Sequence, residues 1–291
     1  MLNKEVISYL SLGSNMKNKI YFILSGLKEI NSLEETEVLE ISSFYETEPW
    51  GLKEQENFYN IVAKIRTKLP PLILLKKLQE IEKKLLRERI IKWGPRTLDI
   101  DIIFYGNLNL NLKELTIPHK RFSQRNFVLK PLMELCKDRN LNKFLKEDCG
   151  KIDKIIPKVG VSSCLLGKNT KYNGGNNKNK FILMIGKKIK FIDVCPETFG
   201  KLECPRSPSE IKNGKVYSRE GKDVTEEFNL GSSLTLNVLK KNEINTVILK
   251  AKSPSCGYGL IYDGTFSGNL IEGNGVTSDL LMKNGIDIIS I

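Results

Sequence analysis

The sequence predicts two domains of mixed helix and strand, an α+β ferredoxin-like domain followed by an α/β domain. The chain has 291 residues, which is enough for two hydrophobic cores. In the first half, strand and helix patterns follow the order βαββαβ, the order of a ferredoxin-like sandwich. In the second half strands alternate with helices, which predicts a Rossmann-like, three-layer domain. A charged, weakly periodic segment separates the halves, so we expect domains at residues 1–140 and 158–291 and a linker at residues 141–157.

Composition is typical of a soluble globular protein. Apolar residues make up 40% of the chain and charged residues 27%, and no apolar run is long enough to cross a bilayer. The N-terminus is strand-like and lacks the pattern of a secretory signal, so we expect a cytoplasmic protein. In that compartment the 6 cysteines are better explained as ligands, reactive thiols or buried apolar residues than as disulfides.

The net charge of +12 bears on the partners of the chain. Nucleic-acid binding is one interpretation of such a charge. The positive charges are spread out, however, and no stripe of arginine and aromatic residues accompanies them. An anionic small-molecule substrate is therefore the stronger interpretation.

The elements of the first domain can be placed by their periodicity. Apolar residues spaced three and four apart indicate helices, and alternating or continuously apolar runs indicate strands. Gly13-Ser14-Asn15 marks a turn and a helix start, and Pro70-Pro71 opens a second helix. The expected strands are residues 5–12, 38–45, 58–67 and 98–105, and the expected helices are residues 20–30 and 71–85.

A pair of acids stands in the last of these strands. Apolar residues alternate with Asp99 and Asp101, so the two carboxylates share one face, about 7 Å apart along the strand. Two carboxylates at that spacing, with Arg96 just before them, suit magnesium held between the protein and the phosphates of a substrate. The plainer alternative is a half-exposed strand with two solvated acids.

Five sequence blocks around these acids carry a family resemblance. They occur in the order found in 6-hydroxymethyl-7,8-dihydropterin pyrophosphokinases, and residues 6–136 resemble that family over its whole length. The resemblance implies an enzyme that uses ATP and two magnesium ions to move a diphosphate onto the pterin hydroxymethyl group, leaving AMP, in folate biosynthesis. The blocks are LSLGSN (10–15), SSFYETEPWG (42–51), QENFYNIV (55–62), WGPRTLDIDII (93–103) and IPHKRFSQRNFVLKPL (117–132).

The same resemblance implies roles for individual residues. Asp99 and Asp101 match the magnesium ligands, and Arg87 and Arg96 match catalytic arginines that contact the phosphates. A planar guanidinium suits that role because it can bind two phosphate oxygens at once. The implied pterin-binding residues are Phe58 and Phe127, which would stack on the ring, with Asn60 and Trp93, and the implied ATP-binding residues are Glu82, His119, Arg121 and Arg125.

Two features depart from the pattern of that family. Leu86 stands where the family usually has glycine before the arginine. The segment from Arg87 to Trp93 is also shorter than usual, by about one residue. Both departures lie in the loop that closes over ATP in the family, so we expect loop closure and turnover to differ more than substrate binding.

In the second half, three cysteines follow predicted strands. Cys164, Cys195 and Cys256 come after the strands expected at residues 159–162, 189–194 and 245–250. The C-terminal edge of a parallel sheet is where sites form in α/β domains. On their spacing alone, isolated cysteines are more often buried apolar residues. The other expected elements are helices at residues 224–239 and 277–283, a loop at residues 199–211 and a last strand at residues 286–291.

Six motifs give this half a resemblance of its own. Residues 158–291 resemble a family of uncharacterised domains that includes bacterial thiouracil desulfidases, which hold a 4Fe–4S cluster on three cysteines. The resemblance implies that Cys164, Cys195 and Cys256 hold such a cluster, because thiolates are its usual ligands. The cysteines left without a role are Cys136, Cys149 and Cys204. The motifs are SSCLLG (162–167), VCPETFG (194–200), PRSPSEI (205–211), LKAKSPSCG (249–257), IYDGTFSG (261–268) and GNGVTSDLL (273–281).

Residues beside the cysteines are candidates for the chemistry of desulfuration. Glu197 follows Cys195 closely, and Ser253 and Ser255 precede Cys256, so we expect them to handle protons and contact a thiolated pyrimidine or similar base. Relatives usually carry glycine at the position of Lys201 and a hydroxyl residue at that of Cys204. Neither replacement removes an expected ligand.

Two other functions stay open for the second half. It could be a zinc- or cluster-stabilised binding module without catalysis, or a domain that interacts with nucleic acid. Near-visible absorbance of oxygen-free protein separates an iron–sulfur cluster from zinc. Salt-dependent RNA binding would favour the nucleic-acid function. We expect no membrane partner.

Overall fold

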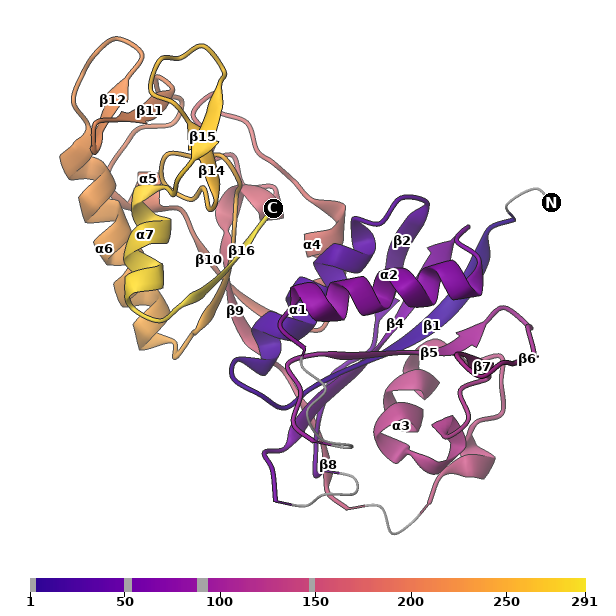
Figure 1. The fold of residues 1–291 in the computed structure, drawn as a ribbon. Coiled ribbons are helices and arrows are strands. Elements are labelled where there is room, and N and C mark those ends of the chain that lie inside the picture. Colours follow the sequence, from indigo (N-terminus) through magenta and orange to yellow (C-terminus); the bar gives the residue numbers. More distant parts are fainter. Residues whose placement is uncertain (1–3, 50–53, 88–93, 147–149) are drawn as a thin grey trace. The chain divides into compact units, whose positions relative to one another are not determined.

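The computed structural model describes residues 4–49, 54–87, 94–146 and 150–291. The chain forms two compact units, Met1–Pro157 and Lys158–Ile291, and both have mixed α/β structure (Figure 1). Within the described ranges, no helix is both long and apolar enough to cross a membrane.

The first unit is built on a six-stranded antiparallel sheet. Its strand order is β5-β1-β4-β3-β8, and β2 also pairs with β4. Because β5, β1 and β4 are neighbours, polar side chains from all three can meet on one face of the sheet. The strands are β1 (Val6–Ser14), β2 (Thr36–Ile41), β3 (Phe44–Thr47), β4 (Phe58–Thr67), β5 (Asp99–Tyr105) and β8 (Ile152–Ile155).

Successive side chains of β1 point to opposite faces of the sheet, and each face packs in its own hydrophobic core. Leu12 is fully buried on the face covered by α1 and α2, whereas Tyr9 packs with α3 on the opposite face. Ser11 and Gly13 lie on the same face as Tyr9, beyond the end of α3, and there the sheet lines a pocket. The helices are α1 (Lys19–Asn31), α2 (Pro71–Lys84) and α3 (Asn126–Leu135), with short elements β6 (Leu110–Asn111), β7 (Thr116–Ile117), η1 (Phe122–Gln124) and η2 (Asn142–Phe144).

The strand expected at residues 38–45 is in fact two strands. Between β2 and β3 the hydroxyl of Ser42 accepts the N–H of Val62 at 2.9 Å. The N–H and hydroxyl of Ser43 both donate to the Glu134 carboxylate at 3.0 Å. These side-chain bonds satisfy the backbone where the chain leaves the ladder, and the continuous apolar pattern of the sequence does not reveal them.

The linker expected at residues 141–157 is only partly correct. It contains β8, which pairs with β3 in the register Phe44↔Ile155 to Thr47↔Ile152 and belongs to the first sheet. The segment is short and has two charged residues between two isoleucines, so its own pattern is weak. The free edge of β3 supplies the backbone partners that make it a strand.

The second unit has a four-stranded parallel sheet, as the alternating pattern predicts. The order is β10-β9-β13-β16. The central strand β13 is buried along its whole length, as expected for a sheet covered on both faces. The elements are β9 (Lys158–Ser162), η3 (Ser163–Leu166), α4 (Lys180–Ile185), β10 (Lys190–Val194), α5 (Pro196–Phe199), α6 (Thr225–Lys241), β13 (Thr246–Leu249), α7 (Val276–Lys283) and β16 (Asp287–Ser290).

Two hairpins in the second unit were not expected from the sequence. β11 (Ser209–Lys212) pairs with β12 (Lys215–Ser218), and β14 (Leu260–Tyr262) pairs with β15 (Leu270–Glu272). The first hairpin has a signal that could have revealed it. Asn213-Gly214 forms its two-residue turn with φ +50 and φ +76, and an Asn-Gly pair between apolar runs is the strongest short hairpin signal.

The short helix α5 is held against α6 by two glycines. A Cβ on Gly231 would lie 1.9 Å from the carbonyl oxygen of Pro196, and one on Gly200 would lie 2.0 Å from that of Glu227. Only glycine permits such a close approach of two backbones. Because α5 directly follows Cys195, these contacts fix where that cysteine stands.

Candidate active sites

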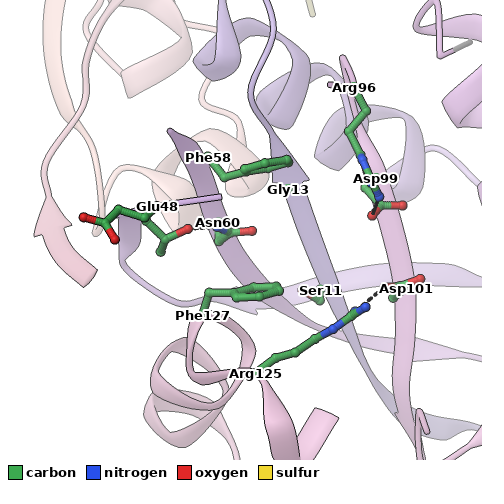
Figure 2. Close-up of a pocket in the computed structure, with 11 residues that line it drawn as sticks. Ser11, Gly13, Glu48, Phe58, Asn60, Arg96, Asp99, Asp101, Arg125 and Phe127 are labelled. Atoms are coloured by element: carbon green, nitrogen blue, oxygen red, sulfur yellow. Dashed lines mark hydrogen bonds and ion pairs between the residues drawn. The ribbon is translucent and has the colours of Figure 1, made fainter. Parts of the chain in front are cut away.

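The pocket of the first unit is lined by residues from five segments of the chain (Figure 2). β1, β4 and β5 contribute neighbouring side chains on one face of the sheet, and the end of β3 and the start of α3 close the sides. The lining residues are Ser11, Gly13, Thr47, Glu48, Phe58, Asn60, Arg96, Asp99, Asp101, Arg125 and Phe127.

Asp99 and Asp101 both face this pocket from β5, as the strand alternation predicts. Burial and the neighbouring charge of Asp99 raise the pKa of Asp101 to about 7, while the charge of Arg125 opposes the rise. Two ionised carboxylates this close are unfavourable without a compensating cation. The pair is therefore well suited to a divalent metal ion.

Arginines already surround the first of these acids. Arg96 Nη1 lies 2.5 Å from Asp99 Oδ2, and Arg87 Nη2 lies 2.6 Å from Asp99 Oδ1. The other terminal nitrogen of Arg87 pairs with Glu82. Both arginines expected to contact phosphates thus stand beside the acid pair.

Glu82 does not line the pocket, although the sequence suggested an ATP contact. Its side chain is only 4% exposed and accepts the N–H of Ile100 at 2.7 Å as well as the Arg87 guanidinium. The apolar helical spacing around it places this carboxylate beneath β5. In the structure it anchors Arg87 and the acid-bearing strand.

His119 stands near Asp101 in a neutral state. Burial, helped by the charge of Arg125, lowers the pKa of His119 to about 4. Its Nδ1 accepts the N–H of Arg121 at 3.3 Å, which leaves the proton on Nε2, 3.8 Å from Asp101 Oδ2. The imidazole can therefore donate a hydrogen bond from Nε2. Arg121 takes part here through its backbone and does not line the pocket.

The rings of Phe58 and Phe127 lie on opposite sides of the pocket, with Asn60 between them (Figure 2). Asn60 Nδ2 donates to Thr47 Oγ1 at 2.8 Å, which fixes the amide. A Cβ at Gly13 would lie 2.7 Å from the Asn60 oxygen, so a glycine is needed opposite it. The gap between the rings suits a flat aromatic ligand. Trp93, expected to bind the same ligand, lies outside the described residues.

Asn15 is a site residue that the sequence reasoning missed. Its side-chain oxygen accepts the N–H of Arg96 at 2.8 Å, and its Nδ2 donates to Gln55 and to the carbonyl of Glu56 at 3.0 and 3.2 Å. It therefore joins the Arg96 loop to the chain just before Phe58. The only local signal is its place at a turn, which does not reveal partners far away in the sequence.

In the second unit, three cysteines gather at the ends of three neighbouring parallel strands. Cys164 follows β9 within η3, Cys195 directly follows β10, and Cys256 lies in the loop after β13. Burial raises the pKa of Cys164 and of Cys256. The charge of Cys195 adds to the rise at both, and that of Cys164 adds to the rise at Cys256. The three thiols therefore share one region, as the strand order predicts.

Other groups complete this region. Glu197 pairs with Arg206 and accepts the hydroxyl of Ser253 at 3.3 Å. The Ser253 oxygen accepts the N–H groups of Ser255 and Cys256, both at 3.1 Å. The sequence reasoning singled out Glu197 and Ser253 but gave no role to Arg206, whose partners lie on other loops.

Lys250 was also missed, although it follows β13 directly. Burial lowers its pKa, whereas the nearby thiols of Cys164 and Cys256 oppose that change. It is thus a partly buried cation beside the thiols, and its electrostatic field favours the thiolate form.

The remaining cysteines lie apart from this region or outside the description. Cys136 is buried in the first unit, and Cys204 is exposed, with Sγ 3.2 Å from two carbonyl oxygens. Cys149 falls among the residues that the structure does not describe. Across the described ranges, no three His, Cys, Asp or Glu side chains stand close enough to hold a metal ion by themselves.

Together these features define an α/β protein with two separate sites, an acid- and arginine-lined pocket between two phenylalanines and a group of three thiols. Residues 9–137 match the family described as 7,8-dihydro-6-hydroxymethylpterin-pyrophosphokinase, and residues 159–291 match that described as 2-thiouracil desulfurase. The chain belongs to the first family in its N-terminal half and to the second in its C-terminal half. Both resemblances expected from the sequence are confirmed.

Individual relatives match one half each. The chain is 43% identical to the 2-amino-4-hydroxy-6-hydroxymethyldihydropteridine pyrophosphokinase of Haemophilus influenzae, over 46% of this chain and 83% of that protein. It is 41% identical to the uncharacterized protein YbbK of Bacillus subtilis, over 45% of this chain and 93% of that protein. A solved structure of the 4Fe-4S-dependent thiouracil desulfidase TudS is 38% identical, over 46% of this chain and 90% of that chain, with a TM-score of 0.44.

Longer relatives are matched only in part. The chain spans 17% of the folic acid synthesis protein fol1 of Pneumocystis carinii and 43% of the bifunctional protein FolKE of Lactococcus lactis.

Proposed function

We propose that the first unit transfers a diphosphate from ATP to 6-hydroxymethyl-7,8-dihydropterin, a reaction of folate biosynthesis. The observation that carries this proposal is a single pocket in which two facing phenylalanine rings stand beside an acid pair and its arginines. A flat ring and a polyphosphate could bind there side by side. Membership of the pyrophosphokinase family supports the same reaction.

The pterin-binding roles follow from the chemistry of the lining residues. Phe58 and Phe127 would stack on the two faces of the ring, and such contacts add about 0.5–1.5 kcal/mol beyond the area they bury. Asn60 uses one amide N–H on Thr47 and presents its remaining polar atoms to the ring edge. The pocket would therefore bind the ring by stacking on its faces and would recognise the pattern of hydrogen-bond donors and acceptors along its edge.

The phosphate-binding roles belong to the opposite side of the pocket. In the reaction, the substrate hydroxyl oxygen bonds to the β-phosphorus of ATP, the bond from that phosphorus to the AMP oxygen breaks, and the hydroxyl proton passes to solvent water. Arg87 and Arg96 would exchange Asp99 for phosphate oxygens, and His119 would donate from Nε2. Arg121 and Arg125 add positive charge on the same side.

Asp99 and Asp101 would hold two magnesium ions. The fit is supported by two carboxylates that face one pocket from β5, and by the pKa of Asp101, which burial and the charge of Asp99 raise to about 7. Because no third protein carboxylate, histidine or thiol stands close enough within the described ranges, phosphate and water would supply the remaining ligands. When bound, magnesium neutralises charge that develops during transfer.

The test is AMP release by the full chain with ATP, magnesium and the dihydropterin. Phe127→Ala should weaken pterin binding more than ATP binding in calorimetry, because the ring loses one stacking partner. Phe122→Ala is the matched control, since Phe122 packs edge-on against Phe104 and Phe144 and does not line the pocket. Absence of AMP release by the wild type would refute the assignment.

We propose that the second unit is a 4Fe–4S-dependent desulfidase of thiolated pyrimidines. Cys164, Cys195 and Cys256 fit the cluster because they follow three neighbouring parallel strands, with the Lys250 cation near Cys164 and Cys256. When bound, the cluster supplies an iron that is open to the substrate sulfur, since three ligands leave one iron free. Overall, water replaces the sulfur of a C=S group, giving C=O and hydrogen sulfide.

The protein groups around the thiols would manage the protons of that exchange. Ser253 donates its hydroxyl to Glu197 and is itself held by two backbone N–H groups. Such a hydroxyl–carboxylate pair can move a proton to or from a water or a leaving sulfide. Family membership supports this second activity as well.

Metal analysis of oxygen-free protein tests the second proposal. We expect iron, inorganic sulfide and brown near-visible absorbance, all lost in Cys195→Ser and kept in Cys204→Ser. A colourless protein that carries zinc would instead indicate a metal-stabilised binding module. A salt-dependent shift on RNA without sulfide release would indicate nucleic-acid binding.

The order of the elements also suggests finer fold classes. We infer a ferredoxin-like core for the first unit, because β2 and β3 together take the place of one strand in the order βαββαβ, and a Rossmann-like arrangement for the second, from parallel strands alternating with helices. We infer further that the boundary between the domains along the sequence lies near residue 157, because β8 belongs to the first sheet and β9 to the second.

A further inference from the structure

The side chain of Arg206 joins separate loops of the second unit. Its Nε donates to Glu197 Oε2 at 2.9 Å, and its Nη2 donates to the same oxygen. Its Nη1 donates to the carbonyl of Glu203, and its Nη2 also to that of Thr170, both at 3.0 Å. The side chain is only 9% exposed. This arginine is therefore fixed on several sides, unlike a surface residue in a single solvated ion pair.

One of these contacts reaches the segment that follows Cys164. Thr170 lies in the loop after η3, and the backbone N–H of Arg206 donates to the carbonyl of Tyr172 in the same loop at 2.7 Å. The carbonyl of Cys164 in turn accepts the N–H of Asn177 at 3.0 Å, where this loop returns. Arg206 thus holds the loop whose two ends flank and contact the first cysteine.

The other contact reaches the remaining two cysteines through Glu197. This residue stands in the first turn of α5, just after Cys195. Its second carboxylate oxygen accepts the Ser253 hydroxyl at 3.3 Å, and Ser253 accepts the N–H of Cys256 at 3.1 Å. A continuous hydrogen-bonded path therefore runs from Arg206 through Glu197 to the backbone of the third cysteine.

Charge adds a second reason for an arginine at this place. The Glu197 carboxylate stands two residues after Cys195 and is hydrogen-bonded to Ser253, which holds the N–H of Cys256. A carboxylate beside thiolates is unfavourable unless a cation offsets it. Arg206 supplies that cation while leaving one oxygen of Glu197 to Ser253.

We propose that Arg206 is a positioning residue for the three-cysteine site, and that through Glu197 it fixes the relative placement of the loops that carry Cys164, Cys195 and Cys256. The inference rests on the proposed function in one respect, that the three thiols hold a cluster. A lysine at this position could pair with Glu197 but could not also reach both backbone carbonyls, because only a guanidinium presents donors in a fixed fork.

Cluster retention in the full chain tests the role directly. The oxygen-free protein is mixed with an iron chelator, and iron release is followed by absorbance. Arg206→Lys should release iron at least about tenfold faster than wild type, since several charge-assisted hydrogen bonds are lost. Arg219→Lys is the matched control, because that guanidinium stands over the Phe266 ring at 5.7 Å and should release iron at the wild-type rate. Equal rates for wild type and Arg206→Lys would overturn the proposal.

A double-mutant cycle shows whether the effect passes through Glu197. Glu197→Gln should also release iron faster, and the double variant should be no faster than the faster single variant. If the fold-increase in iron release of the double variant equals the product of the two single increases, Arg206 acts through the backbone carbonyls alone. That result would overturn the proposed route through Glu197. If Arg206→Lys takes up no cluster, the test uses Glu197→Gln alone. Iron release from Glu197→Gln at the wild-type rate would then refute the route.

A third measurement tests the positioning role of Arg206 independently of whether the protein binds a cluster. Cys256 is 6% exposed, so its alkylation by iodoacetamide in full-length protein stripped of iron reports on the loop that holds it. Arg206→Lys should speed this alkylation, whereas Arg219→Lys should not. If the wild type binds no iron but Arg206→Lys still exposes Cys256, the desulfidase proposal fails and the positioning role stands. Unchanged alkylation in Arg206→Lys refutes the positioning role whether or not iron binds.

Discussion

In the first unit the acid pair and Asn60 project from paired antiparallel strands, whereas in the second unit the three cysteines lie beyond the ends of parallel strands. Asp99, Asp101 and Asn60 are held by the backbone ladder of β1, β4 and β5. Cys164 and Cys256 are held by side-chain bonds between loops that lie far apart in the sequence. The hydrogen bonds between paired strands fix the relative positions of their side chains. Separate loops need contacts between residues distant in sequence to fix theirs.

The difference predicts different sensitivities to mutation. In the first unit, removal of a functional group should cost activity while leaving the sheet intact. In the second unit, a change in packing between elements should disturb the site even where no functional group is altered. The following variants test these expectations, beginning with the largest effect.

Asp101→Asn should lower AMP formation about a hundredfold or more, because a charge that would hold magnesium is lost from the half-buried pocket wall. The substitution keeps the size of the side chain, so the melting temperature should change little. Asp153→Asn on β8 is the matched control, since that carboxylate is exposed and pairs with the exposed Lys151. Near-wild-type turnover by Asp101→Asn would remove this acid from the proposed metal site.

The sequence predicts residues that a local strand pattern places, but it does not predict residues that only long-range contacts place. The alternation along residues 98–105 placed Asp99 and Asp101 on one face, because period two is a local property of a strand. Parallel strand ends predicted that the three cysteines would gather, since strand order brings them to one edge. Arg206 was missed because its contacts with Thr170 and Glu197 depend on tertiary structure alone.

The errors in the fold have equally physical causes. β8 was taken for a linker because its four residues form a strand only against the free edge of β3. The start of β11 was taken for part of a loop at residues 199–211, because the sequence before it is rich in proline, and Asn213-Gly214 was not recognised as the turn of a hairpin. The break between β2 and β3 depends on Glu134, which lies 91 residues beyond Ser43.

Gly231→Ala should destabilise the second unit by about 3 kcal/mol, because the new methyl group would collide with the backbone of α5. The shift of α5 should also disturb Cys195 and Glu197, so cluster retention should fall although no ligand is changed. Ser233→Ala, on the exposed face of the same helix, is the control and should be neutral in urea unfolding. Unaltered stability of Gly231→Ala would show that α5 and α6 have room to separate.

Ending the chain at residue 150 should destabilise the first unit relative to ending it at residue 157. The shorter chain lacks β8, whose backbone hydrogen bonds to β3 contribute on the order of 2 kcal/mol in total. β3 ends at Thr47, which lines the pocket beside Glu48, so pterin affinity should fall as well. The two chains can be compared by thermal unfolding and calorimetry. Equal melting temperatures would mean that β8 contributes nothing to the sheet.

The smallest expected effect concerns backbone strain, which the two units share although their sites differ. Leu86 has φ +63 and Lys201 has φ +64, and at both positions the family resemblance of the sequence implies a glycine. A residue with a Cβ pays roughly 1 kcal/mol in this left-handed region, whereas glycine does not. At each position the glycine variant should therefore be more stable than the alanine variant, by about 1 kcal/mol in urea unfolding.

The sign of that difference is the decisive observation. At Lys76, an exposed position within α2, the order should reverse, because glycine in a helix interior is about 1 kcal/mol less favourable than alanine. If alanine is the more stable choice at Leu86 or Lys201 as well, the backbone there is not left-handed in solution. Leu86→Gly also restores the family residue next to Arg87, so a rise in AMP formation beyond the change in stability would show that strain at this loop limits turnover.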